Sequence, residues 1–138
     1  MAGYFTESNY ENAVLQLLNE ELGYNYIYGP DVERDYHSPL YEDVLLPSLQ
    51  RINKSLPMDA LTEAIYRLKN FETGTLLQKN MVFMDYLQNG VPVKYYDKGE
   101  ERSTLVYLVV FKNPASNEFT VANQWTFIEN SEKRPDVI

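Results

Sequence analysis

The chain has 138 residues, a length that fits one domain and can bury a core without disulfide bonds or structural metal ions. It has no cysteine, which excludes a disulfide framework and thiolate-bound zinc, so a reducing, cytoplasmic setting is expected. Its 20 acidic and 12 basic residues leave a net charge of −8, which argues against a free-standing, non-specific nucleic-acid binder. No apolar run approaches the roughly 20 residues that span a bilayer, so no membrane segment is expected.

Residues 6–22 are predicted to form an amphipathic helix. Thr6 or Ser8 can cap its start, and Ser8 with Glu11 fits a capping box. Gly23 follows the last turn and is predicted to end the helix. The apolar positions at helical spacing are Tyr10, Val14, Leu17, Leu18 and Leu22.

Two acids, Glu7 and Glu11, lie within the arc of this apolar stripe. At about 100° per residue, Glu11 falls close to Leu18. A carboxylate on the buried side of a helix needs a partner, a proton or a metal. The alternative is an ordinary first-turn acid that the helix dipole favours and that stays partly hydrated.

A short strand is predicted over residues 24–28, which alternate in the manner of an extended segment. Gly29 and Pro30 then indicate a turn. Residues 31–38 are polar and are predicted to form a loop that carries the only histidine, His37. We expect this histidine to be solvated, because the sequence has no second histidine to share a metal.

Three more helices are predicted from apolar positions at helical spacing. Their ranges are 40–53, 55–70 and 75–88. Pro47 interrupts the first pattern and would be accepted most easily near the start of a helix. Ser55 is the expected cap of the second helix, and Gly90 is expected to end the third. The apolar stripes are interpreted as core, with Met81 and Met84 filling gaps.

The second half of the chain is predicted to be rich in strands. Strands are expected over 91–96, 102–112 and 118–128, joined by a hairpin turn at 97–100 and a second turn at 113–117. The strand over 102–112 is apolar nearly throughout its middle, which favours cover on both faces. Helices followed by such a meander predict an α+β (mixed α/β) fold.

The last residues, Arg134 to Ile138, end on two β-branched side chains after a proline and an aspartate. This pattern is typical of the first step of another strand, since β-branched residues favour extended backbone. We therefore expect the chain to be a piece of a longer protein, cut inside an element.

Carboxylate groups are the remaining candidates for catalytic chemistry in this sequence. The sequence contains no phosphate-binding loop, G-x-S-x-G, H-E-x-x-H or EF-hand spacing. One histidine and no cysteine make Ser/His or Cys/His catalysis a poor fit. Asp136, next to Pro135 at the start of the last predicted strand, either begins a turn or is one ligand of a Mg²⁺ site.

Six stretches of this sequence resemble the N-terminal domain of the restriction (R, motor) subunit of type I restriction-modification enzymes. They are FTESNYENAVLQLLNEELGYNY, LQRINKSLP with AIYRL, LLQKNMVFMDYLQNGVPV, and VYLVVFKNPASNEFTVANQWTF followed by RPDVI. Together they run in order along nearly the whole chain. The last pair is the strongest, because in that family the corresponding segment runs directly into an R-P-D-hydrophobic strand.

The resemblance implies an incomplete nuclease core of the PD-(D/E)xK class, similar to restriction endonucleases. By resemblance, Asp136 is the first metal-binding aspartate of that motif. Glu11 resembles the helical glutamate that assists the same Mg²⁺ site, and Glu7 is the weaker candidate for that role. Both Asp136 and Glu11 are thus expected to be catalytic and metal-binding residues in the intact domain.

The resemblance also shows what this sequence lacks. The second acid and the lysine of the E-x-K pattern, a later helix with glutamine and tyrosine, and the ATP-driven translocase motifs are not in residues 1–138. We therefore expect the parent protein, and not this chain alone, to cleave double-stranded DNA. The partners implied are DNA and the modification and specificity subunits.

A second hypothesis is a non-catalytic docking module. It would contact a partner subunit through a tyrosine-rich surface and the helices between Leu40 and Gln88.

Overall fold

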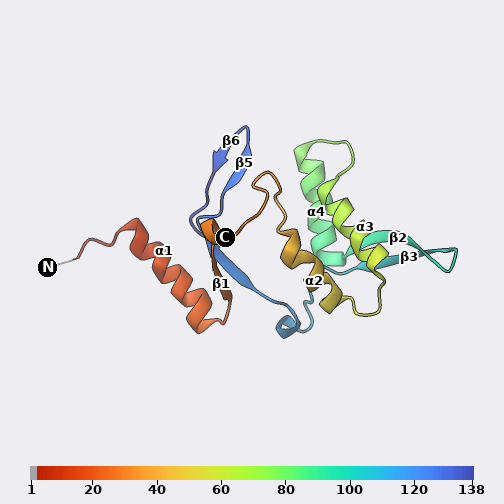
Figure 1. The fold of residues 1–138 in the computed structure, drawn as a ribbon, viewed down its shortest axis with the longest axis horizontal. Helices are drawn as coiled ribbons and strands as arrows, with labels where there is room; N and C mark the ends of the chain where they lie inside the picture. The colour runs from red at the N-terminus through yellow and green to blue at the C-terminus, as the bar shows by residue number, and fades with distance from the viewer. Residues whose placement is uncertain (1–2) are drawn as a thin grey trace. The chain divides into compact units, whose positions relative to one another are not determined.

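The computed structural model describes residues 3–138, which divide into two compact units. Unit 1 comprises the residues up to Pro39 together with Glu118–Ile138, and unit 2 comprises Leu40–Asn117. In chain order the elements are α1 (Glu7–Gln16), a π-helical turn (Leu17–Glu21), β1 (Asn25–Tyr28), a 3-10 turn (Gly29–Asp31), α2 (Glu42–Ile52), α3 (Met58–Lys69), α4 (Leu76–Asn89), β2 (Val91–Asp97), β3 (Glu100–Val106), a second 3-10 turn (Pro114–Ser116), β4 (Thr120–Asn123), β5 (Phe127–Glu129) and β6 (Ser131–Lys133) (Figure 1).

The expected mixed α+β class is confirmed, but the expected meander is wrong. Within residues 3–138 the strands form three two-stranded sheets, β2–β3, β5–β6 and β1–β4. β4 does not continue the β2–β3 hairpin; it pairs in parallel with β1, so that Tyr26 lies opposite Val121. A period-two pattern indicates that a segment is a strand, but it carries little information about which distant strand becomes its partner.

The core of unit 2 lies where α3 packs on the hairpin β2–β3. Its fully or nearly fully buried residues are Leu49, Ala60, Leu61, Ala64, Leu68, Val91, Val93 and Val106. The four members from α3 fall on one face of the helix, as the period of 3.6 residues requires. Two of them are alanines, whose small side chains let the α3 backbone approach the strands closely.

The hairpin between β2 and β3 forms at the predicted place. Its two turn residues, Lys98 and Gly99, both adopt left-handed backbone with φ of 51° and 83°. Such turns match the right-handed twist of paired strands, and glycine adopts the second position without steric cost.

The apolar strand expected over 102–112 is shorter than predicted. β3 ends at Val106, and Tyr107 beyond it is 51% exposed, so cover on both faces is not found. Asparagine side chains replace the missing strand partner. Asn53 accepts from the N–H and donates to the C=O of Tyr107, each at 2.9 Å, and Asn117 does the same for Val110 at 2.8 and 2.9 Å.

Local capping chemistry explains where the helices begin. Thr75 caps α4 in a full capping box with Gln78, a cap that the sequence analysis did not single out. Gly90 ends that helix, as predicted. The expected Ser55 cap is wrong, because α3 begins after Pro57 and has no side-chain cap. Pro47 lies in the interior of α2 rather than near its start, so α2 lacks one backbone hydrogen bond there.

The first helix is capped by Thr6, whose hydroxyl accepts from the backbone N–H of Asn9. The capping box predicted from Ser8 and Glu11 does not form, since Ser8 is already inside α1. The helix widens into a π-helical turn and ends before Gly23, which adopts a positive φ of 74° as expected.

The interpretation of the α4 stripe as core is wrong. Leu76, Leu77 and Met81 are 75%, 70% and 65% exposed, and no residue of α4 is buried. Helical periodicity shows that one face is apolar, but not that another element of the chain covers it. Among the described residues, none of the helices combines the length and the apolar character needed to cross a bilayer.

Unit 1 is organised around the β1–β4 pair (Figure 1). Val121, Ala122 and Trp125 are buried there, together with Leu15 of α1. The loop after β1 contributes Arg34, whose guanidinium lies 3.9 Å from the centre of the Trp125 ring and donates to the backbone C=O of Thr126. His37 lies in the same exposed loop beside Asp35, in agreement with the expected solvated position.

Candidate functional site

The chain end places Asp136 beside β4. Ala122 and Ile138 exchange two backbone hydrogen bonds of 2.9 and 2.8 Å, and the backbone N–H of Gln124 donates to the C=O of Asp136 at 2.9 Å. The last residues therefore run antiparallel to β4, with a bridge between Asn123 and Val137. The expected extra strand forms at least its first step, and it carries the Asp136 carboxylate to the end of β4.

Glu11 reaches the same place from α1. Its carboxylate accepts a hydrogen bond of 2.8 Å from the side-chain amide of Asn123, the last residue of β4. The hydroxyl of Tyr26, on the neighbouring β1, donates to the amide oxygen of Asn123 at 2.9 Å. An ionised carboxylate only accepts, so this chain of contacts directs the Asn123 NH₂ group toward Glu11. The half-buried Glu11 thus has the partner that its position on the helix requires.

Gln124 connects the two acids. Its side-chain nitrogen lies 3.2 Å from each carboxylate oxygen of Glu11 and 3.5 Å from Oδ1 of Asp136. The contact to Asp136 is long and therefore the weaker of the two. We call Glu11 and Asp136 the carboxylate pair. They are separated by more than 120 positions in sequence and share one amide donor.

The backbone of Gln124 is unusual in a way that supports this arrangement. Its φ is 54°, a left-handed conformation that non-glycine residues adopt rarely. Gly29 packs against it: a Cβ added at Gly29 would lie 2.6 Å from the backbone oxygens of both Asn123 and Gln124. Only glycine permits that approach, so the turn after β1 fixes where the Gln124 side chain points.

The donor set of this site fits a hard divalent cation. Mg²⁺ is commonly bound by one or two carboxylates and several waters, and the carboxylate pair offers that number. Within the part of the chain that the structure describes, no cluster of three or more His, Cys, Asp or Glu residues forms a metal site. Glu7 lies exposed in the first turn of α1, one turn before Glu11.

Sequence reasoning did not find the amides of Asn123 and Gln124 or the hydroxyl of Tyr26. One signal was available: two adjacent amide residues follow the apolar pair Val121 and Ala122. Polar residues at buried positions require hydrogen-bond partners, and Asn123 is only 8% exposed.

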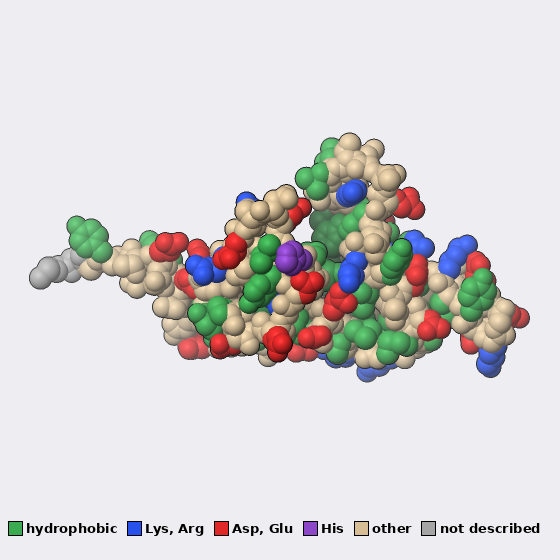
Figure 2. All heavy atoms as spheres, turned by 45° about the horizontal axis from the view of Figure 1, so that its top comes forward, with side chains coloured by type: hydrophobic (Ala, Val, Ile, Leu, Met, Phe, Trp, Pro, Cys, Tyr) green, Lys and Arg blue, Asp and Glu red, His purple; other side chains and the backbone are tan. Residues whose placement is uncertain are grey.

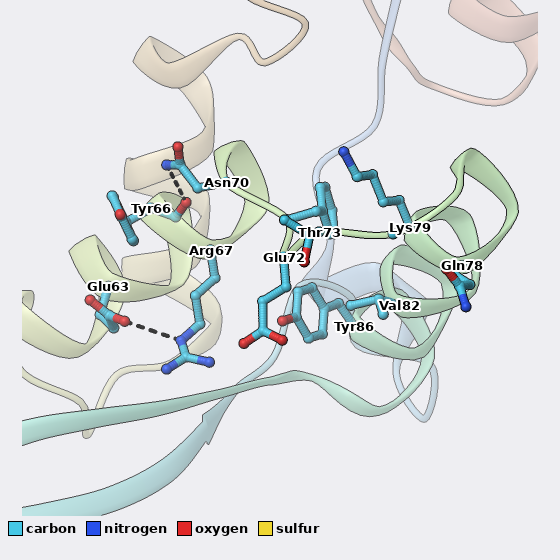
Figure 3. Close-up of a pocket in the computed structure, with 12 residues that line it drawn as sticks. Glu63, Tyr66, Arg67, Asn70, Glu72, Thr73, Gln78, Lys79, Val82 and Tyr86 are labelled. Atoms are coloured by element: carbon cyan, nitrogen blue, oxygen red, sulfur yellow. Dashed lines mark hydrogen bonds and ion pairs between the residues drawn. The ribbon is translucent and has the colours of Figure 1, made fainter.

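Unit 2 contains a separate pocket of about 520 Å³ between α3 and α4 (Figure 3). The Glu63–Arg67 ion pair of 3.1 Å lies on its α3 side, and Lys79 comes from α4. Glu72 balances Lys79 in charge, so the charged groups of this pocket favour neither an anion nor a cation. Figure 2 likewise shows Lys and Arg side chains interspersed with acidic ones on the face in view.

Comparison with known proteins gives the class of protein first. The family described as "Type I restriction enzyme R protein N terminus" matches residues 4–138, and the chain belongs to this family. The expected resemblance is thereby confirmed over nearly the full chain.

Two relatives illustrate the match. The chain is 30% identical to the inferred MjaIXP endonuclease subunit of a type I restriction enzyme of Methanocaldococcus jannaschii, over 93% of this chain and 13% of that protein. It is 28% identical to the HindI type I restriction enzyme endonuclease subunit of Haemophilus influenzae, over 96% of this chain and 13% of that protein. The chain thus spans about an eighth of the length of these relatives. No solved structure matches it.

Proposed function

We propose that this chain forms part of the DNA-cleaving nuclease domain of a type I restriction enzyme R subunit, which hydrolyses phosphodiester bonds of double-stranded DNA with Mg²⁺ in the intact protein. The observation that carries the proposal is the meeting of Glu11 and Asp136 on the Gln124 amide. Two acids from opposite ends of the chain, brought to one place, match the one or two carboxylates that commonly bind Mg²⁺. Relatives named as endonuclease subunits support the same conclusion.

The residues of this chain have distinct roles in the proposal. Glu11 and Asp136 would hold the cation through carboxylate oxygens, and Asn123 orients Glu11 by its 2.8 Å hydrogen bond. Bound Mg²⁺ would supply positive charge for the phosphodiester group and the attacking water. The side chain of Asp136 is exposed, which leaves this carboxylate accessible to a phosphate from solvent.

The chain by itself is expected to be inactive. The acid and the lysine of the E-x-K pattern do not occur after Asp136 within residues 1–138. Without them the attacking water would lack a second acid on the cation and a group that activates it. We expect ATP to act on other parts of the intact protein, because this sequence has no phosphate-binding loop.

The test is DNA cleavage by a longer polypeptide that contains this sequence, assayed with Mg²⁺ and ATP. Asp136→Ala is expected to lower the cleavage rate by more than about 100-fold, since even residues that only support metal ligands cost 10–100-fold. Glu11→Ala is expected to lower it as well. Glu7→Ala is the matched control, an acid of the same helix that is exposed, and should cleave like the unmodified protein. Unchanged cleavage by Asp136→Ala rules the proposal out.

A second candidate function is subunit docking through α4, and one observation favours it. The apolar face of α4 carries Leu77, Met81 and Met84, which line an open groove of about 390 Å³. Contiguous exposed apolar side chains commonly mark protein interaction sites. The partner would be a modification or specificity subunit of the restriction-modification complex, and the relevant assay is assembly rather than cleavage.

A further inference from the structure

We propose that Gln124 is the positioning residue of the carboxylate pair: its side-chain amide holds Glu11 and Asp136 together while no cation is bound. This inference rests on the proposed function, because it concerns the site that would bind Mg²⁺. It adds a role for a residue that contributes no acid and no charge to that site.

Electrostatic repulsion acts between the two acids of the carboxylate pair. Glu11 and Asp136 both lie within 3.5 Å of one nitrogen atom, so two carboxylates approach each other without a cation between them. Like charges at such separations repel, and the repulsion favours their moving apart. An amide NH₂ group has two donors, and it can therefore offset the repulsion by offering one to each acid.

Backbone contacts set the direction of the Gln124 side chain. Gln124 leaves β4 with a left-handed φ of 54°, and its backbone N–H is bound to the C=O of Asp136 at 2.9 Å. The close approach of Gly29 to the backbone oxygen of Gln124 holds that conformation. The side chain is thus aimed at the acids by backbone contacts that do not involve either carboxylate group. That independence is what distinguishes a positioning residue from a side chain that merely fills space.

Gln124 and its neighbour Asn123 differ in how many of the two acids they contact. Asn123 donates to Glu11 alone and is anchored by Tyr26, so it fixes one acid. Gln124 is the residue that contacts both acids among the hydrogen bonds described for residues 3–138. Without the Gln124 amide, Glu11 and Asp136 should therefore share no hydrogen-bond donor, and their carboxylates should only repel each other.

The experiment uses the 138-residue chain and tests whether the effect of Asp136→Ala on stability changes sign when the Gln124 amide is removed. Urea unfolding is followed by the fluorescence of Trp125, the single tryptophan, which is buried in unit 1. EDTA and low ionic strength keep the site free of cations and the charges unscreened. Asp136→Ala should lower the unfolding midpoint of the otherwise unmodified chain. In the Gln124→Leu background it should raise the midpoint, because the substitution then removes a repelling charge.

Matched variants separate this effect from backbone strain. Asn130 has nearly the same left-handed φ, 52°, in the β5–β6 turn, so Asn130→Leu reports the cost of leucine in that conformation. In the Asn130→Leu background, Asp136→Ala should still lower the midpoint. If Gln124→Leu does not fold, Gln124→Asn replaces it: asparagine tolerates left-handed backbone, but it is one methylene too short to reach both acids.

A second readout needs no substitution at Gln124. The side-chain NH₂ resonances of Gln124 should shift in both Asp136→Ala and Glu11→Ala, and remain in place in Glu7→Ala. The inference is overturned if Asp136→Ala changes the urea midpoint in the same direction in all backgrounds. It is also overturned if the Gln124 NH₂ resonances do not shift on substitution of either acid. If the longer polypeptide with Asp136→Ala still cleaves DNA, the proposed nuclease function is refuted. That result would not change the expected signs of the Asp136→Ala effect on the urea midpoint.

Discussion

At the scale of single residues, Arg34 is the clearest example of a side chain that joins distant segments. Its guanidinium lies over the rings of Trp125 and Tyr36, at 3.9 and 4.8 Å from the ring centres, and it donates to the C=O of Thr126. A planar cation stacks on aromatic faces and retains in-plane donors for hydrogen bonds, which an ammonium group does not. Arg34 therefore ties the loop after β1 to the segment after β4.

We expect Arg34→Lys to lower the free energy of unfolding of unit 1 by about 1–2 kcal/mol, because lysine keeps the charge but loses the stacking and the fork of donors. Urea unfolding followed by Trp125 fluorescence measures the loss. Arg102→Lys, at an exposed position of β3, should change stability by less than about 0.5 kcal/mol. Equal effects of the two substitutions would contradict this role for Arg34.

At the scale of elements, the end of α2 is joined to the end of β3 by one buried asparagine. Asn53 is 6% exposed, and its side chain pairs with both backbone groups of Tyr107 while it donates to the C=O of Leu49. Backbone groups at the helix end and at the strand end thus both have the Asn53 side chain as a hydrogen-bond partner. Asn70 at the end of α3 makes the same contact to the fourth residue before it, but it is exposed.

Asn53→Ala is expected to lower the free energy of unfolding by about 2–4 kcal/mol, because it removes three hydrogen bonds and leaves backbone groups of Tyr107 without partners. Asn70→Ala should cost less than about 1 kcal/mol, since water replaces the lost contact. Circular dichroism at the helical band during urea unfolding measures both. A loss for Asn53→Ala no larger than for Asn70→Ala would show that the junction carries little stability.

At the scale of the whole molecule, two neighbouring helices of unit 2 differ in how many of their apolar residues are buried. α3 supplies four residues to the buried core, while no residue of α4 is buried and only Tyr86 of α4 packs against that core. The α4 side chains Leu76, Leu77, Met81 and Met84 are exposed. The stability of unit 2 should therefore depend little on the α4 face.

We expect the double substitution Leu77→Glu and Met81→Glu to leave the urea midpoint of the chain nearly unchanged, because both side chains are already exposed. If α4 docks a partner, the same variant of the longer polypeptide should lose co-purification with the modification and specificity subunits. Thr62→Glu, on the exposed face of α3, is the control and should assemble normally. Full assembly of the α4 variant would rule out docking through this face.

Several elements follow from the sequence because the interactions that define them are local. Thr75 and Gln78 are three residues apart, and the turn at Lys98 and Gly99 needs only two residues with left-handed backbone. Such caps and turns depend on contacts within about four positions, which a sequence pattern contains. Both acids of the carboxylate pair were also predicted from the sequence, through their position on a helix and the resemblance of the last residues to a known motif.

The pairing of β4 with β1, the exposure of α4 and the meeting of Glu11, Gln124 and Asp136 were decided only by the tertiary structure. The first and last of these features join positions about 90 to 125 apart in the sequence. The exposure of α4 depends on whether any other element covers its apolar face. Apolar periodicity is the same for a strand with any partner and for a helix face with none. The sequence by itself therefore determined the local elements and the family, whereas long-range packing determined which amides contact the two acids.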